Sequence, residues 1–176
     1  TSAEEARKTG GTFVHPYNDH RVVAGQGTIG LELCDQLEDD VDAVLVPTSG
    51  GGMVSGIAAA VRARAPHARV VACEPAGKRL QAALAARERV LDASTADAAL
   101  PTVADAIRTQ ALGEIAWQLC AAEGLLDPTV LSVTDDMIAA AVRLTLTELK
   151  QAVEPAGGVA LAAALSPAFA ALRDEG

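Results

Sequence analysis

Two short aliphatic runs without polar alternation constrain the fold of this chain most strongly. Residues 42–47 (D-A-V-L-V-P) and residues 69–73 (R-V-V-A-C) have the unbroken apolar character of strands buried on both faces of a parallel sheet. Between them, residues 53–65 form an alanine-rich stretch with helical spacing that ends before Pro66. A strand, a helix and a second strand in this order predict parallel α/β architecture.

The rest of the chain extends this pattern into an α/β fold, an open, mostly parallel twisted sheet with helices on both faces. Ser2 and Glu5 form a capping box that predicts a first helix ending at Gly10. We expect strands over residues 12–14 and 130–133. Further helices are expected over residues 29–37, 78–89, 113–122, 134–151 and 157–165, and a long ordered loop over residues 92–109.

Composition excludes several classes of protein. The chain has 176 residues, of which 38 are Ala and only 2% are aromatic, so we expect one core of closely packed helices and aliphatic strands. A formal net charge of -9 without a basic run argues against a nucleic-acid partner. No apolar run approaches the roughly 20 residues of a membrane span. The three cysteines, without C-x-x-C spacing, are expected to be buried reduced thiols of a cytoplasmic protein.

The sharpest local signal is T-S-G-G-G-M (residues 48–53), between a predicted buried strand and a predicted helix. Successive glycines let the backbone approach an anion, and their N–H groups add to the positive end of the helix dipole. The segment therefore predicts a phosphate site, although a tight strand-to-helix turn explains the same residues. It matches neither G-x-x-x-x-G-K-[ST] nor G-x-G-x-x-G, which weakens an ATP or dinucleotide interpretation.

Polar residues elsewhere are weaker candidates. His15 and His20 are candidates for acid–base work, although a loop-ordering or surface role is the commoner one for such histidines, and His67 is expected to be exposed. Asp105 and Arg108 lie in the long loop, where Arg108 pairs either with Asp105 or with a substrate carboxylate. Glu74 and Glu154 each end an element and are candidates for catalysis, metal binding or capping of nearby N–H groups.

Five segments in this order resemble the fold-type II pyridoxal phosphate enzymes, specifically the threonine dehydratase and serine racemase branch. They are F-V-H-P-Y-N-D with V-V-A-G-Q-G-T-I-G-L-E (residues 13–32), V-P-T-S-G-G-G-M-V-S-G-I-A (46–58), A-C-E-P (72–75), T-V-A-D-A-I-R-T (102–109) and V-E-P-A-G-G-V-A (153–160). The resemblance runs the whole length of the chain. It implies the large, cofactor-binding domain of such an enzyme, with pyridoxal 5'-phosphate as cofactor.

The resemblance also implies roles for individual residues. It implies that the cofactor phosphate is held by Ser49, Gly50, Gly51, Gly52 and Met53, and that Glu154 lies beside the pyridine ring. Glu74 matches a strand-end glutamate that helps to bind a divalent cation in racemase-like members. Those members have an aspartate six residues later, where this chain has Leu80. We therefore expect that Glu74 forms no strong Mg²⁺ or Ca²⁺ site.

The family's cofactor-binding lysine lies in a segment resembling S-F-K-x-R-G, and its substrate-carboxylate loop resembles S-S-G-N-H-A. Neither motif occurs here, and Lys8, Lys78 and Lys150 have different surroundings in the sequence. We therefore expect residues 1–176 to be part of a large domain, without the portion that carries the catalytic lysine and without the small domain. The parent would be a homodimeric ammonia-lyase or racemase acting on L-serine or L-threonine. A noncatalytic phosphate-binding protein and a subunit completed by a separate chain remain the alternatives.

Overall fold

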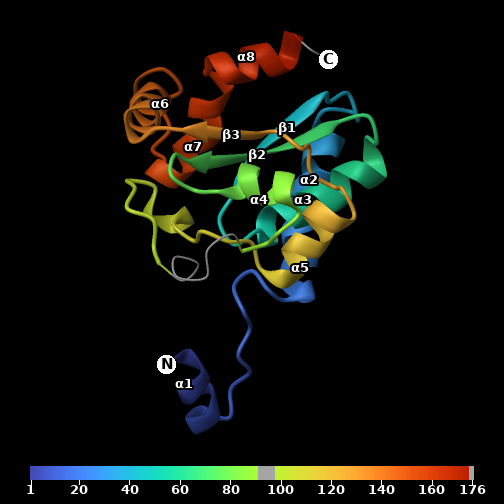
Figure 1. Cartoon of the computed structure of the whole chain (residues 1–176), viewed down its shortest axis with the longest axis vertical. Helices are drawn as coiled ribbons and strands as arrows, with labels where there is room; N and C mark the ends of the chain where they lie inside the picture. Colours follow the sequence, from blue (N-terminus) through green and yellow to red (C-terminus); the bar gives the residue numbers. More distant parts are fainter. Residues whose placement is uncertain (91–97, 175–176) are drawn as a thin grey trace.

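A three-stranded parallel sheet forms the centre of the computed structural model, which describes residues 1–90 and 98–174 (Figure 1). The strands are β1 (Ala43–Pro47), β2 (Arg69–Pro75) and β3 (Val130–Val133), and their order in the sheet is β1-β2-β3. Ala43 is in register with Arg69, and Ala72 with Val130. The parallel α/β prediction is confirmed, and the carboxyl ends of all three strands lie at one edge of the sheet.

The described residues also contain eight α-helices and two further helical turns. They are α1 (Ser2–Thr9), α2 (His20–Gln36), α3 (Gly52–Arg64), α4 (Leu80–Ala86), the 3-10 turn η1 (Asp105–Ile107), α5 (Glu114–Trp117), the π-helical turn η2 (Gln118–Ala122), α6 (Asp135–Thr147), α7 (Pro155–Ala164) and α8 (Pro167–Asp174). All of the α-helices except α1 lie around the sheet (Figure 1).

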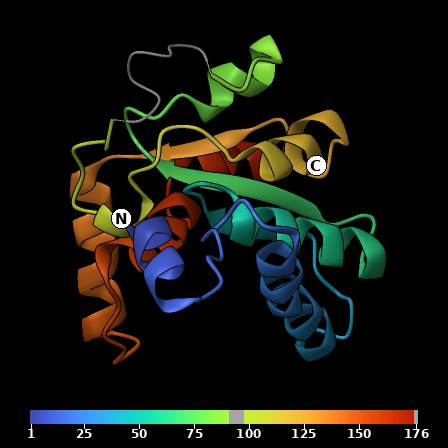
Figure 2. The same cartoon turned by 90° about the horizontal axis from the view of Figure 1, so that it is seen from below.

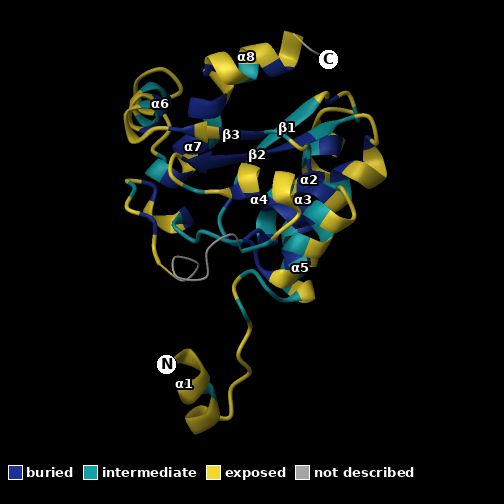
Figure 3. Cartoon of the chain, in the orientation of Figure 1, coloured by how far each residue is buried: buried dark blue, intermediate teal, exposed yellow. Residues whose placement is uncertain are grey.

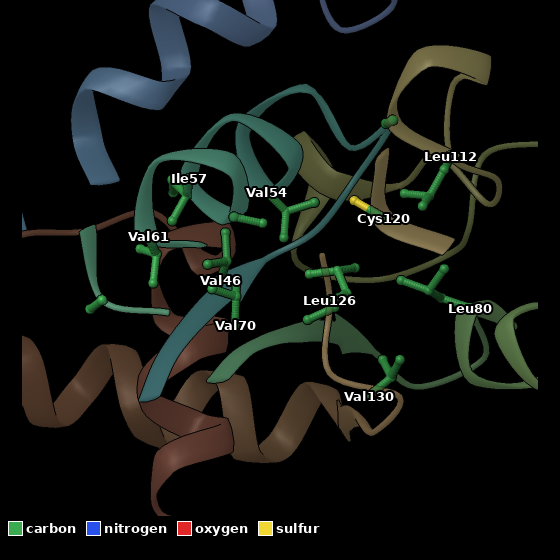
Figure 4. Packing of buried hydrophobic residues seen from close by; sticks show 14 of the residues in the cluster. Val46, Val54, Ile57, Val61, Val70, Leu80, Leu112, Cys120, Leu126 and Val130 are labelled. Atoms are coloured by element: carbon green, nitrogen blue, oxygen red, sulfur yellow. The ribbon is translucent and has the colours of Figure 1, made fainter. Parts of the chain in front are cut away.

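Both faces of the sheet are buried, because alternate residues of β2 belong to two separate cores. Val70 and Ala72 pack with α3, α5 and η2, whereas Val71 and Cys73 pack with α6 and α7. Figure 4 shows the first core, with side chains of α3 lying over Val46 and Val70. In Figure 2, the orange α6 and the blue α2 lie on opposite sides of the molecule. This two-sided burial explains why the strands have no polar alternation.

The three cysteines lie in these cores, as the sequence predicted. Cys34, Cys73 and Cys120 are all buried and free. Burial raises the pKa of Cys73 and of Cys120 to about 12, because a thiolate would be desolvated there. These two thiols are therefore protonated and unreactive at neutral pH.

Helices α2 and α3 pack closely because glycines line their contact. An added Cβ at Gly30 would lie 2.9 Å from the Cβ of Ala60 and 2.9 Å from the carbonyl oxygen of Ile57. At Gly56, an added Cβ would lie 2.3 Å from the carbonyl oxygen of Val23. The backbones thus approach at distances that leave no room for side chains. This contact fixes α3, and therefore the segment that leads into it.

Two predictions near the N-terminus are wrong. Residues 12–14 form no strand, because no described strand pairs with them, and Phe13 and Val14 remain about half exposed. The first capping box is formed one residue earlier than predicted, by Thr1 and Glu4. Helix α1 has no buried residue, and in Figure 3 it lies apart from the body of the molecule. The capping interactions at the two ends of α1 therefore specify this helix, and packing against the rest of the molecule does not contribute.

Other boundaries differ from the predictions at the ends of elements. The helix predicted over residues 113–122 becomes π-helical at residue 118, and helix α8 was not predicted. Helix α8 begins where the Ser166 hydroxyl accepts a hydrogen bond from the N–H of Phe169. Residues 92–97 of the predicted loop lie outside the described residues, and residues 98–109 contain only η1.

No single described helix has the length and apolar character needed to cross a membrane. Helices α7 and α8 reach this length and apolar character only as a pair, and the two helices are bent by 48° relative to each other. Five residues of α7 are buried, and four of them, Ala156, Val159, Ala162 and Ala163, belong to the second core.

The contact between α2 and α3 can be tested with two substitutions in one helix. Gly30→Ala should lower the free energy of unfolding by about 1–3 kcal/mol, because the methyl group overpacks the contact. Gly25→Ala is the control, since an added Cβ there meets nothing within 4 Å. It should raise stability by up to about 1 kcal/mol through helix propensity. Equal effects in urea denaturation would contradict the account of this contact.

Candidate functional site

The segment joining β1 to α3 has the backbone geometry of an anion site. We call residues 49–53 the glycine loop. Gly51 has a φ of 94°, in the left-handed region that favours glycine, and it forms the N-cap of α3 without a side-chain cap. Within the described part of the chain, no backbone carbonyl accepts from the N–H groups of Met53 or Val54. The start of α3 therefore presents N–H donors and the positive end of the helix dipole.

Segments distant in sequence hold the glycine loop on two sides. An added Cβ at Gly50 would lie 2.4–2.6 Å from three ring atoms of Tyr17, and one at Gly51 would lie 2.6 Å from the Cβ of Ala116. The carbonyl oxygen of Gly50 accepts a hydrogen bond from the N–H of Gly113 at 2.9 Å. From within α3, the buried Ser55 hydroxyl donates to the carbonyl oxygen of Gly51 at 2.8 Å. These contacts thus hold the loop in place without a bound ligand.

A cavity of about 420 Å³ opens over the glycine loop. Besides the loop, it is lined by Tyr17, Gln26, Ala106 and Thr109, so it brings together three of the segments singled out in the sequence. A neighbouring cavity of about 510 Å³ shares Tyr17, Ala106 and Thr109 with it. The site therefore lies at the carboxyl edge of the sheet, where open α/β folds bind ligands.

The segment before α2 orders the walls of both cavities. His15 lines the larger cavity, and its Nδ1 accepts a hydrogen bond from the N–H of Asn18 at 2.9 Å. The side-chain oxygen of Asn18 accepts from the N–H of Ile115 at 3.0 Å. His15 thus has the loop-ordering role, while its acid–base role stays a prediction. His20 is exposed as the first residue of α2, and His67 is exposed as predicted.

Asp135 fixes the loop that carries Ala106 and Thr109, a role that the sequence analysis missed. Its carboxylate accepts from the Thr102 hydroxyl at 2.5 Å and from the N–H of Val103 at 3.2 Å. The only signal was its position after β3, at the start of α6. Arg108 donates from Nε to the carbonyl oxygen of Leu100 at 2.7 Å, and no ion pair joins it to Asp105. Both Arg108 and Asp105 line the larger cavity.

Glu74 is buried at the end of β2, with 1% of its surface exposed. Burial raises the pKa of Glu74 to about 7, and the positive charge of Lys78 and the N–H of Leu80 partly oppose that effect. Burial also lowers the pKa of Lys78 to about 8, partly offset by Glu74. Lys78 donates from Nζ to the carbonyl oxygen of Thr48 at 2.7 Å, directly before the glycine loop.

The surroundings of Glu74 do not fit a divalent cation. Mg²⁺ and Ca²⁺ prefer about six or more oxygen ligands. Residues 1–90 and 98–174 contain no group of three His, Cys, Asp or Glu side chains that could hold a metal ion. Leu80, at the position where an aspartate would be expected, is buried in the first core. The expectation that Glu74 forms no strong Mg²⁺ or Ca²⁺ site remains a prediction that these observations favour.

Glu154 lies at the N-cap of α7, where its side chain is exposed and makes no capping hydrogen bond. Helix α7 packs against η1, whose Ala106 and Ile107 line the cavity over the glycine loop. Glu154 itself lines neither of the two cavities. Its predicted place beside a pyridine ring stays a prediction.

Comparison with known proteins agrees with this geometry. A family model described as "Pyridoxal-phosphate dependent enzyme" matches residues 1–175. The chain belongs to this family. Within it, the chain lies in the fold-type II branch of serine racemases and threonine dehydratases.

Two relatives and one solved structure show how similar this chain is to members of the family. Serine racemase of Arabidopsis thaliana is 39% identical over 163 residues, which cover 93% of this chain and 46% of that protein. L-threonine ammonia-lyase of Thermotoga maritima is 37% identical, over 90% of this chain and 38% of that protein. The structure of maize serine racemase matches with a TM-score of 0.85 at 37% identity, over 96% of this chain and 48% of that one. The chain thus spans about half the length, or less, of these family members.

The buried carboxyl group of Glu74 generates a prediction about pH. Because the pKa is about 7 in the folded chain and 4.5 ordinarily, folding favours the protonated carboxyl group. The stability that this group contributes is present below about pH 4.5 and is lost as the pH rises through about 7. Relative to Glu74→Gln, the free energy of unfolding should therefore fall by about 3 kcal/mol across this window. Urea denaturation at several pH values measures the difference, and a constant difference would contradict the assignment.

Proposed function

We propose that this chain forms the cofactor-binding part of a pyridoxal 5'-phosphate-dependent ammonia-lyase or racemase of hydroxy amino acids, with the glycine loop as the phosphate site. The observation that carries the proposal is the fixed loop at the start of α3, with N–H groups of Met53 and Val54 that no described backbone carbonyl satisfies. A dianionic phosphate is the ligand that such donors and a helix N-terminus bind best.

The cavity over the loop fits a bound cofactor. Its floor is the glycine loop, and its walls are Tyr17, Ala106 and Thr109. In the proposed complex, Ser49, Gly50, Gly51, Gly52 and Met53 bind the phosphate, and the Ser49 hydroxyl adds one donor. Glu154 would adjust the electronic state of the ring by lying beside it. When bound, pyridoxal phosphate supplies an electron sink for negative charge at the substrate's α-carbon.

None of the three lysines of the chain is placed to bind a cofactor in the two cavities. Lys8 is exposed on α1, Lys150 is exposed after α6, and the ammonium group of Lys78 binds the carbonyl oxygen of Thr48. None of them lines either cavity. We therefore propose that the lysine that binds the cofactor, and the loop that binds the substrate carboxylate, come from a segment outside residues 1–176. The parts described here bind and orient the cofactor.

Relatives in the branch support the substrate class. Their names specify serine racemase and L-threonine ammonia-lyase, so L-serine and L-threonine are the proposed substrates of the intact enzyme. Loss of the β-hydroxyl group with release of ammonia and reprotonation of the α-carbon begin with removal of the same proton. A homodimer is the proposed assembly of the intact enzyme, because residues 13–14 and 29–31 leave apolar side chains exposed on the isolated chain.

The phosphate site can be tested by a matched pair of glycine substitutions. Gly51→Ala should weaken binding of inorganic phosphate and of pyridoxal phosphate by at least about tenfold, because its methyl group would displace the loop. Gly124→Ala is the control, since Gly124 also has a positive φ of 65° but an added Cβ there meets nothing within 4 Å. It shares the backbone strain and should retain affinity. Calorimetric titration of both variants decides, and unchanged binding in Gly51→Ala would overturn the site.

The role assigned to the lysines predicts the activity of the 176-residue chain. With pyridoxal phosphate added, the chain should form keto acid from L-serine or L-threonine, or racemise L-serine, no faster than free pyridoxal phosphate does. Coupled keto-acid detection and chiral chromatography measure the two reactions. Faster turnover that disappears on replacing Lys8, Lys78 or Lys150 would show that this chain carries its own catalytic lysine.

A further inference from the structure

The partly buried ammonium group of Lys78 lies between the end of β2 and the start of the glycine loop. The N–H of Lys78 donates to the carbonyl oxygen of Pro75 at 3.4 Å, and Gly77 between them has a φ of 99°. This tight turn brings Lys78 back toward the strand end that carries Glu74. The ammonium group then reaches the carbonyl oxygen of Thr48, 30 residues earlier in the chain.

When Glu74 is ionised, a nearby positive charge stabilises it in this position. Its Oε2 is buried without a hydrogen-bond partner among the described residues. A buried carboxylate without compensation is costly, and Lys78 is the charged side chain that favours its ionised form. No salt bridge within 4.0 Å joins the two described groups, so Lys78 acts on Glu74 through space while binding Thr48 directly.

The contact with Thr48 has a direct consequence for the glycine loop. The carbonyl group of Thr48 and the N–H of Ser49 belong to one planar trans peptide, so fixing the carbonyl fixes the direction of the N–H. Because the carbonyl points at Lys78, the N–H of Ser49 points away from it. The N–H of Thr48 is held independently, since it donates to the carbonyl oxygen of Cys73 at 2.8 Å. The two peptides that lead into the loop, on either side of Thr48, are therefore each held by one hydrogen bond.

We propose that the ammonium group of Lys78 is a built-in cation that acts on Glu74 through space and positions the glycine loop through Thr48, in the place where the resemblance implies a divalent cation for racemase-like members. Lys78 is then a positioning residue. A covalently attached cation makes the loop geometry independent of metal concentration. The effect on phosphate rests on the proposed function, whereas the cation site itself can be tested without phosphate.

The test compares two substitutions that differ in the space they leave. Lys78→Ala removes the charge and leaves room for a cation, whereas Lys78→Met removes the charge and fills most of the space. Both should lower the thermal midpoint more than Arg79→Ala, a control at the exposed neighbouring residue. Propylammonium, which reproduces the deleted part of the side chain, should raise the midpoint of Lys78→Ala in a concentration-dependent way. It should not raise that of Lys78→Met or of the double variant Glu74→Gln, Lys78→Ala.

Two outcomes would overturn the proposal. One is a rise in the midpoint of the unsubstituted chain with millimolar Mg²⁺, because the site would then accept a metal ion beside Lys78. The other is a Lys78→Ala variant that is as stable as Arg79→Ala and is indifferent to propylammonium. If Lys78→Ala does not fold, the Mg²⁺ titration of the unsubstituted chain and the midpoint of Lys78→Met still decide.

Phosphate binding provides a separate readout. Calorimetry with inorganic phosphate should show about tenfold weaker binding to Lys78→Met and restoration by propylammonium only in Lys78→Ala. If the unsubstituted chain binds no phosphate, the proposed function fails while the midpoints still test the cation. If phosphate binds equally to Lys78→Met and to the unsubstituted chain, the positioning role of Lys78 is wrong.

Discussion

The enclosure of a three-glycine turn between a buried strand and a helix is the constraint on which the rest of the site depends. Gly50 lies against the ring of Tyr17, and Gly51 lies against Leu112 and Ala116, so neither position has room for a side chain. These neighbours come from segments before α2 and around α5. The same packing that closes the first core therefore also sets the direction of the backbone N–H groups at the start of α3. An anion site made from backbone groups needs such support, because the loop has few side chains of its own to hold it.

Both apolar packing and an electrostatic contact act on this loop. The apolar contacts come from the face of the sheet covered by α3 and α5, and the charged contact comes from the turn after β2. Glu74 and Lys78 are costly to bury, and the pKa values of both groups move toward neutrality for that reason. Because burying both groups is costly for stability, the role proposed for the pair is control of loop geometry. Asp135 has a comparable role for the loop that forms the opposite wall of the cavity.

Much of the fold could be predicted from the sequence because its signals are local. Residues 42–47 and 69–73 have no polar alternation, and both faces of the sheet are indeed buried. The strand predicted over residues 12–14 failed because a strand needs a partner, and local propensity cannot supply one. Helix α8 was missed although Ser166 and Pro167 form a recognisable helix start. The glycine loop was found, but its enclosure by Tyr17 and its link to Lys78 join residues about 30 apart, which no local pattern indicates.

The central claim is that the backbone of the glycine loop binds phosphate, and amide NMR tests it most directly. In a titration of the ¹⁵N-labelled chain with inorganic phosphate, the amide signals of Gly50, Gly51, Gly52 and Met53 should shift together and saturate with one dissociation constant. The signals of exposed glycines such as Gly10 should stay in place. The account would be contradicted if the signals of Arg89 and Arg108, in the neighbouring cavity, shifted saturably while the four amide signals of the loop did not shift.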